Sequence, residues 1–491
     1  MKTVLYVLAA PICRYLQLCA LLPFLAACAS QPNHPSYFTQ NAGVDCLPAL
    51  QATSDGPQPN QDGGYYLHVI EFDDQGWAFP EKTREDVPPP SPTYRIDCAI
   101  RHLRATIESA RPALTFVYVH GWHHTAADSD DDLLKFKETL REQYRRHGQE
   151  RRVIGYYIGW NGESIDIPLL RQTTFWGRKN AAHHVAEGSV REFFARLKAL
   201  REYWNRPSNA ESIGMHDCRR GDDGQGVRLR GPECPIRTVM MGHSFGAWIL
   251  FASTSPYILE TLASASDVPL NPKAKQTERE RGIADLVVLI NPAFEASRYD
   301  AIFNAARRYN SERYELPLLV TITSDNDNAT GTLFPVARAA NSAFQYPATS
   351  DLESRAMKRT HGHMTEYLTH ELRFEGQWSN ADERYDPCRT ADESAALRKE
   401  FVERLKASYP RPAPGRLQRQ FCGGLALTWS GGPLSTPDSI VWNIRTHASV
   451  IDGHNGIHRR PFEYFLEQMY EDLSDIPRFT WTGREIGRGA P

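Results

Sequence analysis

Residues 242–246, Gly-His-Ser-Phe-Gly, carry the clearest chemical signal in the chain. They form a Gly-x-Ser-x-Gly pattern between an apolar run that reads as a strand and another that reads as a helix. Such a turn is sharp, so glycines flank the serine where a Cβ would clash, and the hydroxyl is exposed at a helix N-terminus that favours developing negative charge. The pattern predicts that Ser244 is a nucleophile for acyl transfer, whereas His243 beside it is expected to pack rather than to act as a base.

The segments around this motif alternate between strands and helices. Continuous runs of β-branched and aromatic residues, typical of strands buried on both faces, predict strands at residues 65–72, 114–119, 153–158, 238–241, 286–290, 318–322 and 440–444. Helices are expected after a cap at Ser129, with Asp130, Asp131 and Asp132 in the first turn, and at about 173–204, 247–262 and 461–473. The chain is therefore predicted to be an α/β protein, with a mostly parallel central sheet covered by helices on both faces.

A long insertion interrupts this alternation before the last strand. Residues 329–438 read as mixed helix and loop, and they would overhang the strand ends, where α/β sheets bind ligands. We therefore expect residues 329–438 to include a candidate lid or cap.

The bulk composition narrows the classes of function. The net charge is −3 over 491 residues and 41% of the residues are hydrophobic, with no basic stripe or acidic tail. Nucleic acid is therefore not an expected partner, and the chain can bury a large core. The sequence does not indicate an oligomeric state.

The order of these motifs resembles the α/β-hydrolase fold, in particular its serine esterases and lipases. The resemblance covers most of residues 65–473 and implies hydrolysis of a carboxylic ester, with a lipid ester as one option. The family's His-Gly-x oxyanion motif matches residues 120–122, His-Gly-Trp. By this resemblance, the backbone N–H groups of Trp122 and Phe245 form the oxyanion hole, where each such donor stabilises a transition state by about 3–4 kcal/mol.

The same resemblance places the catalytic acid after the next-to-last strand, where residues 323–330 read Thr-Ser-Asp-Asn-Asp-Asn-Ala-Thr. Spacing alone does not separate Asp325 from Asp327, and Glu295 after the preceding strand is a third candidate. Asp327 is preferred because the family's acid usually lies a few residues past the strand end. Asp325 is then expected to brace the loop by accepting backbone N–H bonds.

The family's histidine follows the last strand, where His454 lies in a glycine-flanked loop with room to reach the serine. His447 is expected to lie still within the strand, and His458 near the closing helix, so His454 is preferred. The resulting order Ser244, Asp327, His454 is the order that α/β-hydrolases use.

The remaining histidine pairs and triplets do not match a metal-binding motif. None has a His-Glu-x-x-His pattern or a nearby cysteine pair. We therefore expect no metal and no cofactor. These histidines are His120, His123 and His124, His183 and His184, and His361 and His363.

The N-terminus indicates export. Lys2 and Arg14 accompany a short apolar stretch that ends at residues 25–28, Leu-Ala-Ala-Cys, which resembles a bacterial lipobox. This resemblance implies a signal peptide over 1–27 and a lipidated, diacylated Cys28. Residues 28–63 are then a flexible tether and residues 64–491 the hydrolase domain. Ala29, by resemblance to sorting rules, implies an anchor in the outer membrane facing the periplasm.

The cysteine count agrees with an oxidising compartment. Nine cysteines are present and three lie within the first 28 residues, which leaves an even number for disulfides. Short separation suggests Cys218–Cys234, and the shared insertion suggests Cys388–Cys422, so Cys46–Cys98 is the remaining pair.

Taken together, the sequence predicts a membrane-tethered serine hydrolase that acts on an ester or lipid. The alternative is a non-catalytic envelope lipoprotein that uses the fold as a binding or assembly module, because a fold alone does not establish function.

Overall fold

The computed structural model describes the greater part of the chain, in segments that begin at residue 64. The described residues are 64–79, 93–162, 171–215, 235–266, 282–308, 316–342, 348–376, 391–407, 417–431 and 439–475. The predicted signal peptide, the tether and Cys28 lie outside these residues, as do Cys46, Cys218, Cys234 and Cys388. In the segments that are described, no helix is long and apolar enough to cross a bilayer.

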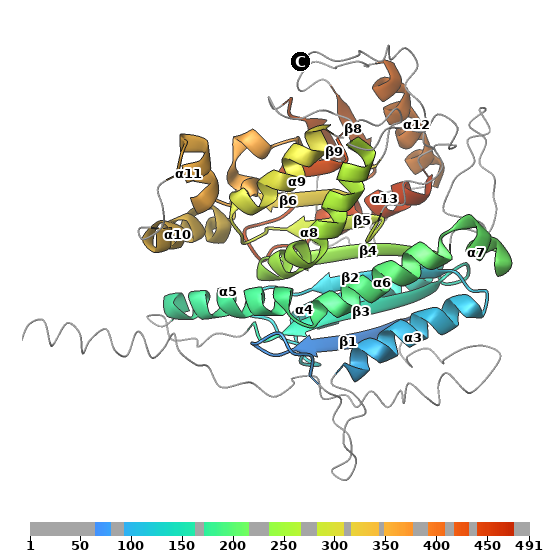
Figure 1. Ribbon diagram of the computed structural model, residues 1–491. Coiled ribbons are helices and arrows are strands. Elements are labelled where there is room, and N and C mark those ends of the chain that lie inside the picture. The colour runs from blue at the N-terminus through green and yellow to red at the C-terminus, as the bar shows by residue number, and fades with distance from the viewer. Residues whose placement is uncertain are drawn as a thin grey trace, which may run out of the picture.

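In the described residues, a sheet of ten strands forms the centre of the fold (Figure 1). Its order is β1-β3-β2-β4-β5-β6-β10-β7-β9-β8, and every pairing is parallel except those of β9 with β7 and β8. The α/β class and the mostly parallel sheet predicted from the sequence are therefore confirmed. The strands are β1 (Tyr66–Phe72), β2 (Ala113–Val119), β3 (Arg152–Trp160), β4 (Ile236–His243), β5 (Leu286–Ile290), β6 (Leu319–Ser324), β7 (His370–Phe374), β8 (Gln418–Phe421), β9 (Leu425–Trp429) and β10 (Val441–Thr446).

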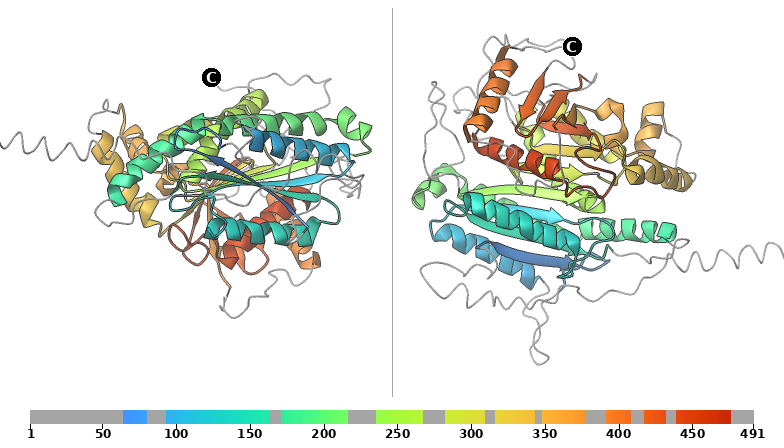
Figure 2. Two further views of the ribbon diagram at one scale, coloured as in Figure 1. Left: turned by 90° about the horizontal axis from the view of Figure 1, so that it is seen from below. Right: turned by 180° about the vertical axis from the view of Figure 1, so that it is seen from behind.

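Helices cover both faces of this sheet, as Figure 2 shows when the molecule is seen from below. The helices are α3 (Tyr94–Glu108), α4 (Asp131–His147), α5 (Arg171–Glu187), α6 (Val190–Trp204), α7 (Pro207–Ser212), α8 (Phe245–Ser266), α9 (Ala296–Arg308), η1 (Ala329–Leu333), α10 (Phe334–Ser342), α11 (Asp351–Lys358), η2 (His361–His363), η3 (Thr365–Tyr367), α12 (Ala391–Ala407) and α13 (Arg460–Asp475).

Strand β2 shows why the sequence runs are apolar without alternation. All seven of its residues are buried. Val117 and Val119 pack into the core that includes α3, α5, α6 and α8. Phe116 and Tyr118 point to the opposite face and pack into the core that includes α4 and α13. A strand between two helical layers needs apolar side chains on both faces, because successive residues alternate sides.

Two expectations about the helices were wrong in detail. The cap of α4 is Asp130, whose side chain accepts the N–H of Asp132 at 2.9 Å, and not Ser129. The helix expected over 173–204 is two helices, α5 and α6, which are separated at Gly188. A Cβ at Gly188 would lie 2.3 Å from the carbonyl oxygen of Gly76, so close backbone packing explains the break. Helix α3 was not anticipated from the sequence.

The insertion between β6 and β10 differs from the predicted mixture of helix and loop. Its strands β7, β9 and β8 extend the sheet beyond β10, and Thr369 begins this addition by donating its N–H to the Asn443 carbonyl at 2.9 Å. The first part of the insertion, η1 and α10, lies shortly after the carboxyl end of β6 in the chain, whereas its later strands join the sheet. Each added strand is five residues or shorter, which is too short for a clear periodicity in the sequence.

Candidate active site

The turn at Ser244 has the geometry that the glycine spacing indicated. Ser244 lies between β4 and α8 with φ +54°, a left-handed conformation that is unfavourable for a residue with a side chain. A Cβ at Gly246 would lie 2.2 Å from the carbonyl oxygen of Val119, so only glycine fits there. The Ser244 N–H donates to the Ile290 carbonyl at 3.0 Å, which holds the strained turn against the neighbouring strand β5.

One chain of hydrogen bonds joins Ser244, His454 and Asp327. His454 Nε2 lies 2.8 Å from Ser244 Oγ, and His454 Nδ1 lies 2.8 Å from Asp327 Oδ2. Since an ionised carboxylate only accepts, Nδ1 carries the proton and Nε2 accepts from the serine hydroxyl. The residues follow β4, β10 and β6, whose carboxyl ends meet at one edge because these strands are parallel.

Asp327 is held as a buried carboxylate. Its side chain is 0% exposed, and Oδ1 accepts the backbone N–H groups of Ala329 at 2.9 Å and Thr330 at 3.1 Å. The Thr330 hydroxyl donates to Oδ2. Burial by itself would raise the pKa of Asp327, but the hydrogen bonds from His454 and Thr330 and the charge of His454 outweigh it and lower the pKa to about 2. The group is therefore ionised at neutral pH.

The other two candidate acids lie elsewhere. Asp325 is exposed. Glu295 is buried and forms ion pairs with Lys179, with Arg338 at 2.8 Å and with Arg298 at 3.3 Å. The three cations lie on α5, α10 and α9, so Glu295 links these three helices through its ion pairs. Of the three candidates, the structure brings Asp327 to His454.

The expectation that Asp325 braces the loop was wrong, because Asn326 has that role. Its Oδ1 accepts the N–H of Gly453 at 2.8 Å, and its Nδ2 donates to Asp452 Oδ1 at 2.9 Å. The amide bridges the loop after β6 to the loop that carries His454. An amide both donates and accepts, which a carboxylate at neutral pH cannot do.

The two alternative histidines also lie away from the serine. His447 follows β10 rather than lying within it, and its Nδ1 contacts Ser449 Oγ at 3.1 Å. His458 lies before α13, with its Nε2 3.1 Å from Asp132 Oδ1.

Two side chains that hold the backbone of His454 were not identified from the sequence. Asn291 Nδ2 donates to the His454 carbonyl at 2.8 Å, and its Oδ1 accepts the N–H of Ser324 at 2.9 Å. His243 Nε2 donates to the same carbonyl at 2.9 Å. Burial first, and then the charge of His454, lowers the pKa of His243 to about 3, so this imidazole is neutral. In the sequence, the only hint for Asn291 was an amide directly after a predicted buried strand. In the structure, Asn291 adopts φ +43°.

The segment predicted to form the oxyanion hole passes beside Ser244. A Cβ at Gly121 would lie 3.1 Å from the Ser244 Cβ, so the backbone of this segment lies against the serine. His120 is fully buried; its Nε2 accepts the Trp160 N–H at 3.0 Å, and its Nδ1 donates to the Gly121 carbonyl at 3.0 Å. Burial lowers the pKa of His120 to about 4, so it is a neutral structural residue. The Trp122 ring packs 6.3 Å from the Phe245 ring, centroid to centroid.

The other histidine groups have protein partners. His361 Nε2 contacts Thr321 Oγ1 at 3.0 Å, and His363 Nε2 contacts Thr330 Oγ1 at 2.9 Å. Because the Thr330 hydroxyl donates to Asp327, His363 donates to Thr330 and extends the polar network around the acid. Within the described segments, no group of three or more His, Cys, Asp or Glu side chains is arranged to hold a metal ion.

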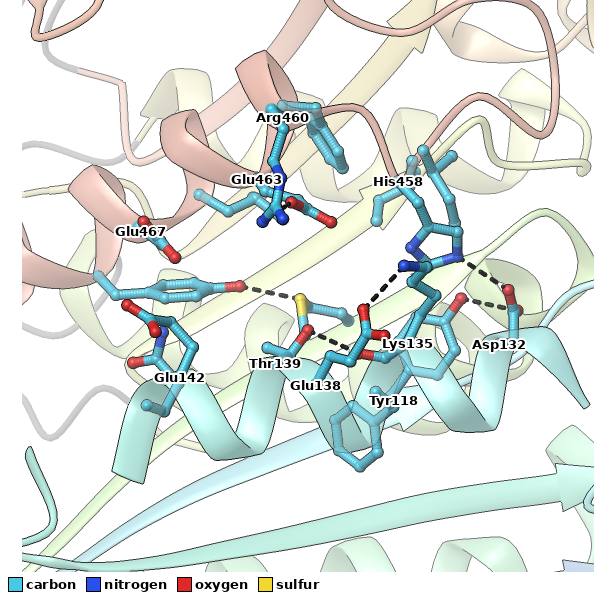
Figure 3. A pocket seen from close by; sticks show the side chains of 18 residues that line it. Tyr118, Asp132, Lys135, Glu138, Thr139, Glu142, His458, Arg460, Glu463 and Glu467 are labelled. Atoms are coloured by element: carbon cyan, nitrogen blue, oxygen red, sulfur yellow. Dashed lines mark hydrogen bonds and ion pairs between the residues drawn. The ribbon is translucent and has the colours of Figure 1, made fainter. Parts of the chain in front are cut away.

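A cavity of about 110 Å³ lies between α4 and α13 (Figure 3). Tyr118, Met241 and Tyr470 line it, together with carboxylates of both helices, among them Glu138 and Glu142 of α4 and Glu463 and Glu467 of α13. The residues that line it do not include Ser244, Asp327 or His454. This cavity is therefore separate from the serine site.

Comparison with protein-family models, curated proteins and solved structures found no match to this chain.

Proposed function

We propose that the protein is a serine hydrolase of the α/β-hydrolase fold, which cleaves a carboxylic ester through an acyl-enzyme. The observation that carries this proposal is the placement of His454 between Ser244 Oγ and Asp327 Oδ2, at 2.8 Å from each. A nucleophile within hydrogen-bond reach of a base, and a base oriented by a buried carboxylate, is the arrangement that activates a serine hydroxyl.

In the first half of the reaction, Ser244 Oγ attacks the ester carbonyl carbon while its proton moves to His454 Nε2. The tetrahedral intermediate collapses when the bond to the alcohol oxygen breaks, and His454 returns the proton to that oxygen. The alcohol leaves and the acyl group stays on Ser244. In the second half, His454 takes a proton from water, the hydroxide attacks the acyl carbon, and the carboxylic acid leaves as Ser244 recovers its proton.

Asp327 stabilises the charged imidazole and selects its tautomer. Its pKa of about 2 keeps it ionised throughout the neutral range, so it accepts from Nδ1 and leaves Nε2 facing the serine. The hydrogen bonds to Oδ1 fix the orientation of the carboxylate, which supports this positioning role.

The backbone N–H groups of Trp122 and Phe245 are the proposed oxyanion donors. Phe245 begins α8 directly after the serine, where the helix dipole also favours negative charge. The backbone of Gly121 lies close to Ser244, which supports a position for the neighbouring Trp122 N–H on the same side of the serine as the Phe245 N–H.

A lipid ester is the proposed substrate class. Leu333 and Val336, in η1 and α10 shortly after Asp327, are 61% and 67% exposed. Exposed apolar side chains in the segment that follows the proposed acid along the chain would favour contact with an acyl chain or a lipid surface. A lipid anchor at Cys28 in the outer membrane would hold the domain close to such a substrate.

The anchor can be tested directly. Mass spectrometry of the detergent-extracted mature chain should show a diacylated N-terminus at Cys28, and Cys28→Ser should release the protein into the aqueous phase. A mature chain that starts at another residue would contradict the anchor. Peptide mapping without reduction should recover the three predicted disulfides, including Cys98 with Cys46 and Cys422 with Cys388.

The catalytic proposal is tested with a fluorophosphonate probe and a series of nitrophenyl esters of increasing acyl length. Wild type should be labelled at Ser244 and should hydrolyse the esters, whereas Ser244→Ala should lose labelling and on the order of 10⁴-fold or more in turnover. Ser253→Ala is the matched control, because Ser253 lies on the same helix and donates to the Ala186 carbonyl. Failure of wild type to react with probe and esters would favour a non-catalytic envelope lipoprotein.

A further inference from the structure

A second carboxylate–histidine network surrounds Asp132, in the first turn of α4. The Asp132 side chain is 3% exposed, and its Oδ2 accepts the Tyr118 hydroxyl at 2.8 Å. Its Oδ1 lies 3.1 Å from His458 Nε2 (Figure 3) and 3.6 Å from His124 Nε2. His124 in turn places Nδ1 3.1 Å from Asp130 Oδ1. One buried carboxylate therefore contacts side chains from three separate segments.

Two of those segments carry the proposed catalytic groups. His124 lies two residues past Trp122, and His458 lies four residues past His454. Asp132 and His458 are 326 residues apart in the chain, so this contact depends entirely on the tertiary fold. The oxyanion segment and the histidine loop meet at this single carboxylate.

The loop around His454 is compact enough to transmit a displacement. An isolated bridge between Asp452 and Gly456 closes the turn around His454, and Ile457 next to it is buried. We therefore expect a displacement of His458 to move this closed turn, and with it His454, as a unit. The carbonyl of His454 is held from the other side by Asn291 and His243.

The charge on Asp132 is maintained by its partners. Burial alone would raise the pKa of this carboxyl, but the hydrogen bond from His458 and the electrostatic interaction with His124 outweigh burial and hold the pKa well below its usual range. A buried ionised carboxylate without such partners would be strongly unfavourable, so the histidines and the carboxylate depend on each other.

We propose that Asp132 is a positioning residue for the reaction proposed above, and that it holds the loop of His454 against the segment of Trp122 through His458 and His124. This inference rests on the proposed function. Asp132 does not touch the reacting atoms, and it acts by setting the place of the base and the oxyanion donors relative to the serine. Misplacement of a catalytic group by about 1 Å can cost on the order of 10²-fold in rate.

The test compares Asp132→Asn with Asp131→Asn, which removes the same charge from the same helical turn at an exposed position. Asp132→Asn should lower kcat by about 10- to 100-fold and change KM by less than about twofold, since substrate binding is preserved while the geometry of the base is lost. Fluorophosphonate labelling should slow in parallel. His458→Gln should behave alike, and the double variant should lose little more than either single variant, because the two groups act as a unit.

Thermal unfolding and amide hydrogen exchange separate positioning from folding. A folded Asp132→Asn protein with kcat within about twofold of wild type, or a change in KM alone, would overturn the proposal whatever its melting temperature. If wild type shows no turnover or labelling, the proposed function fails instead. Hydrogen exchange of the amides at 450–459 then tests whether Asp132 holds the His454 loop in place. Faster exchange in Asp132→Asn than in Asp131→Asn supports this role, and equal exchange rejects it.

Discussion

Replacing Asp327 with Asn tests the proposed role of this residue most sharply, because the change keeps the shape and reverses one hydrogen bond. Oδ1 of Asp327 accepts two backbone N–H groups, so the amide oxygen of Asn is expected to take that position. The amide nitrogen must then face His454 Nδ1 and donate to it. His454 would carry its proton on Nε2 and could no longer accept the proton of Ser244.

The expected loss follows from this tautomer change. Turnover of a nitrophenyl ester should fall by about 10⁴-fold, which is the scale of losing the tautomer-fixing carboxylate in a serine triad. Asp325→Asn is the control, since it removes the same charge two residues earlier at an exposed position and should stay within about twofold of wild type. An Asp327→Asn enzyme within tenfold of wild type, or a swap of the two phenotypes, would refute the assignment.

The same variant should change acid stability in a defined direction. A pKa of about 2, against an ordinary value of 3.8, corresponds to roughly 2 kcal/mol in favour of the folded state. For a depressed pKa, this stability is present above the unfolded pKa and is lost as pH falls from about 4 through 2. Urea unfolding should therefore show a difference between wild type and Asp327→Asn at pH 7 that shrinks towards pH 2; a constant difference would contradict the linkage.

Three further substitutions test the surroundings of the site. Asn291→Ala should lower kcat about tenfold and destabilise the fold by about 1–3 kcal/mol, because it removes a donor to the His454 carbonyl, as steady-state kinetics and urea unfolding can check. Gly246→Ala should abolish soluble expression or labelling, since its Cβ would lie 2.2 Å from a carbonyl oxygen of β2; a folded, fully active variant would contradict the close approach. Burial would lower the pKa of His124, but the hydrogen bond to Asp130 and the nearby carboxylate charges outweigh burial and raise this pKa. The contribution of His124 to stability is therefore full below about pH 6.5 and declines as pH rises further. The drop in melting temperature caused by His124→Gln should accordingly be larger at pH 6 than at pH 9.

The sequence identified the elements of the sheet that position the serine, because their signals are local. An apolar run without alternation reports burial on both faces, as in β2, and every strand from β1 to β6, together with β10, was predicted from its apolar residues. The short strands β7, β8 and β9 were not, since so few residues carry no usable period. Their place in the sheet depends on pairing with β10 and with one another, which the local pattern does not encode.

The same division applies to the candidate site. The sequence by itself determined the turn at Ser244, because glycine spacing, strand and helix all lie within a few neighbouring residues. It narrowed the acid and the histidine to short lists, but spacing could not choose between Asp325 and Asp327. Only the tertiary structure decided which carboxylate reaches His454 over 127 residues of chain, and which side chains hold that loop. The physical reason is that a side chain's reach depends on how separate strand ends and helices pack together, and that packing is a property of the whole sheet.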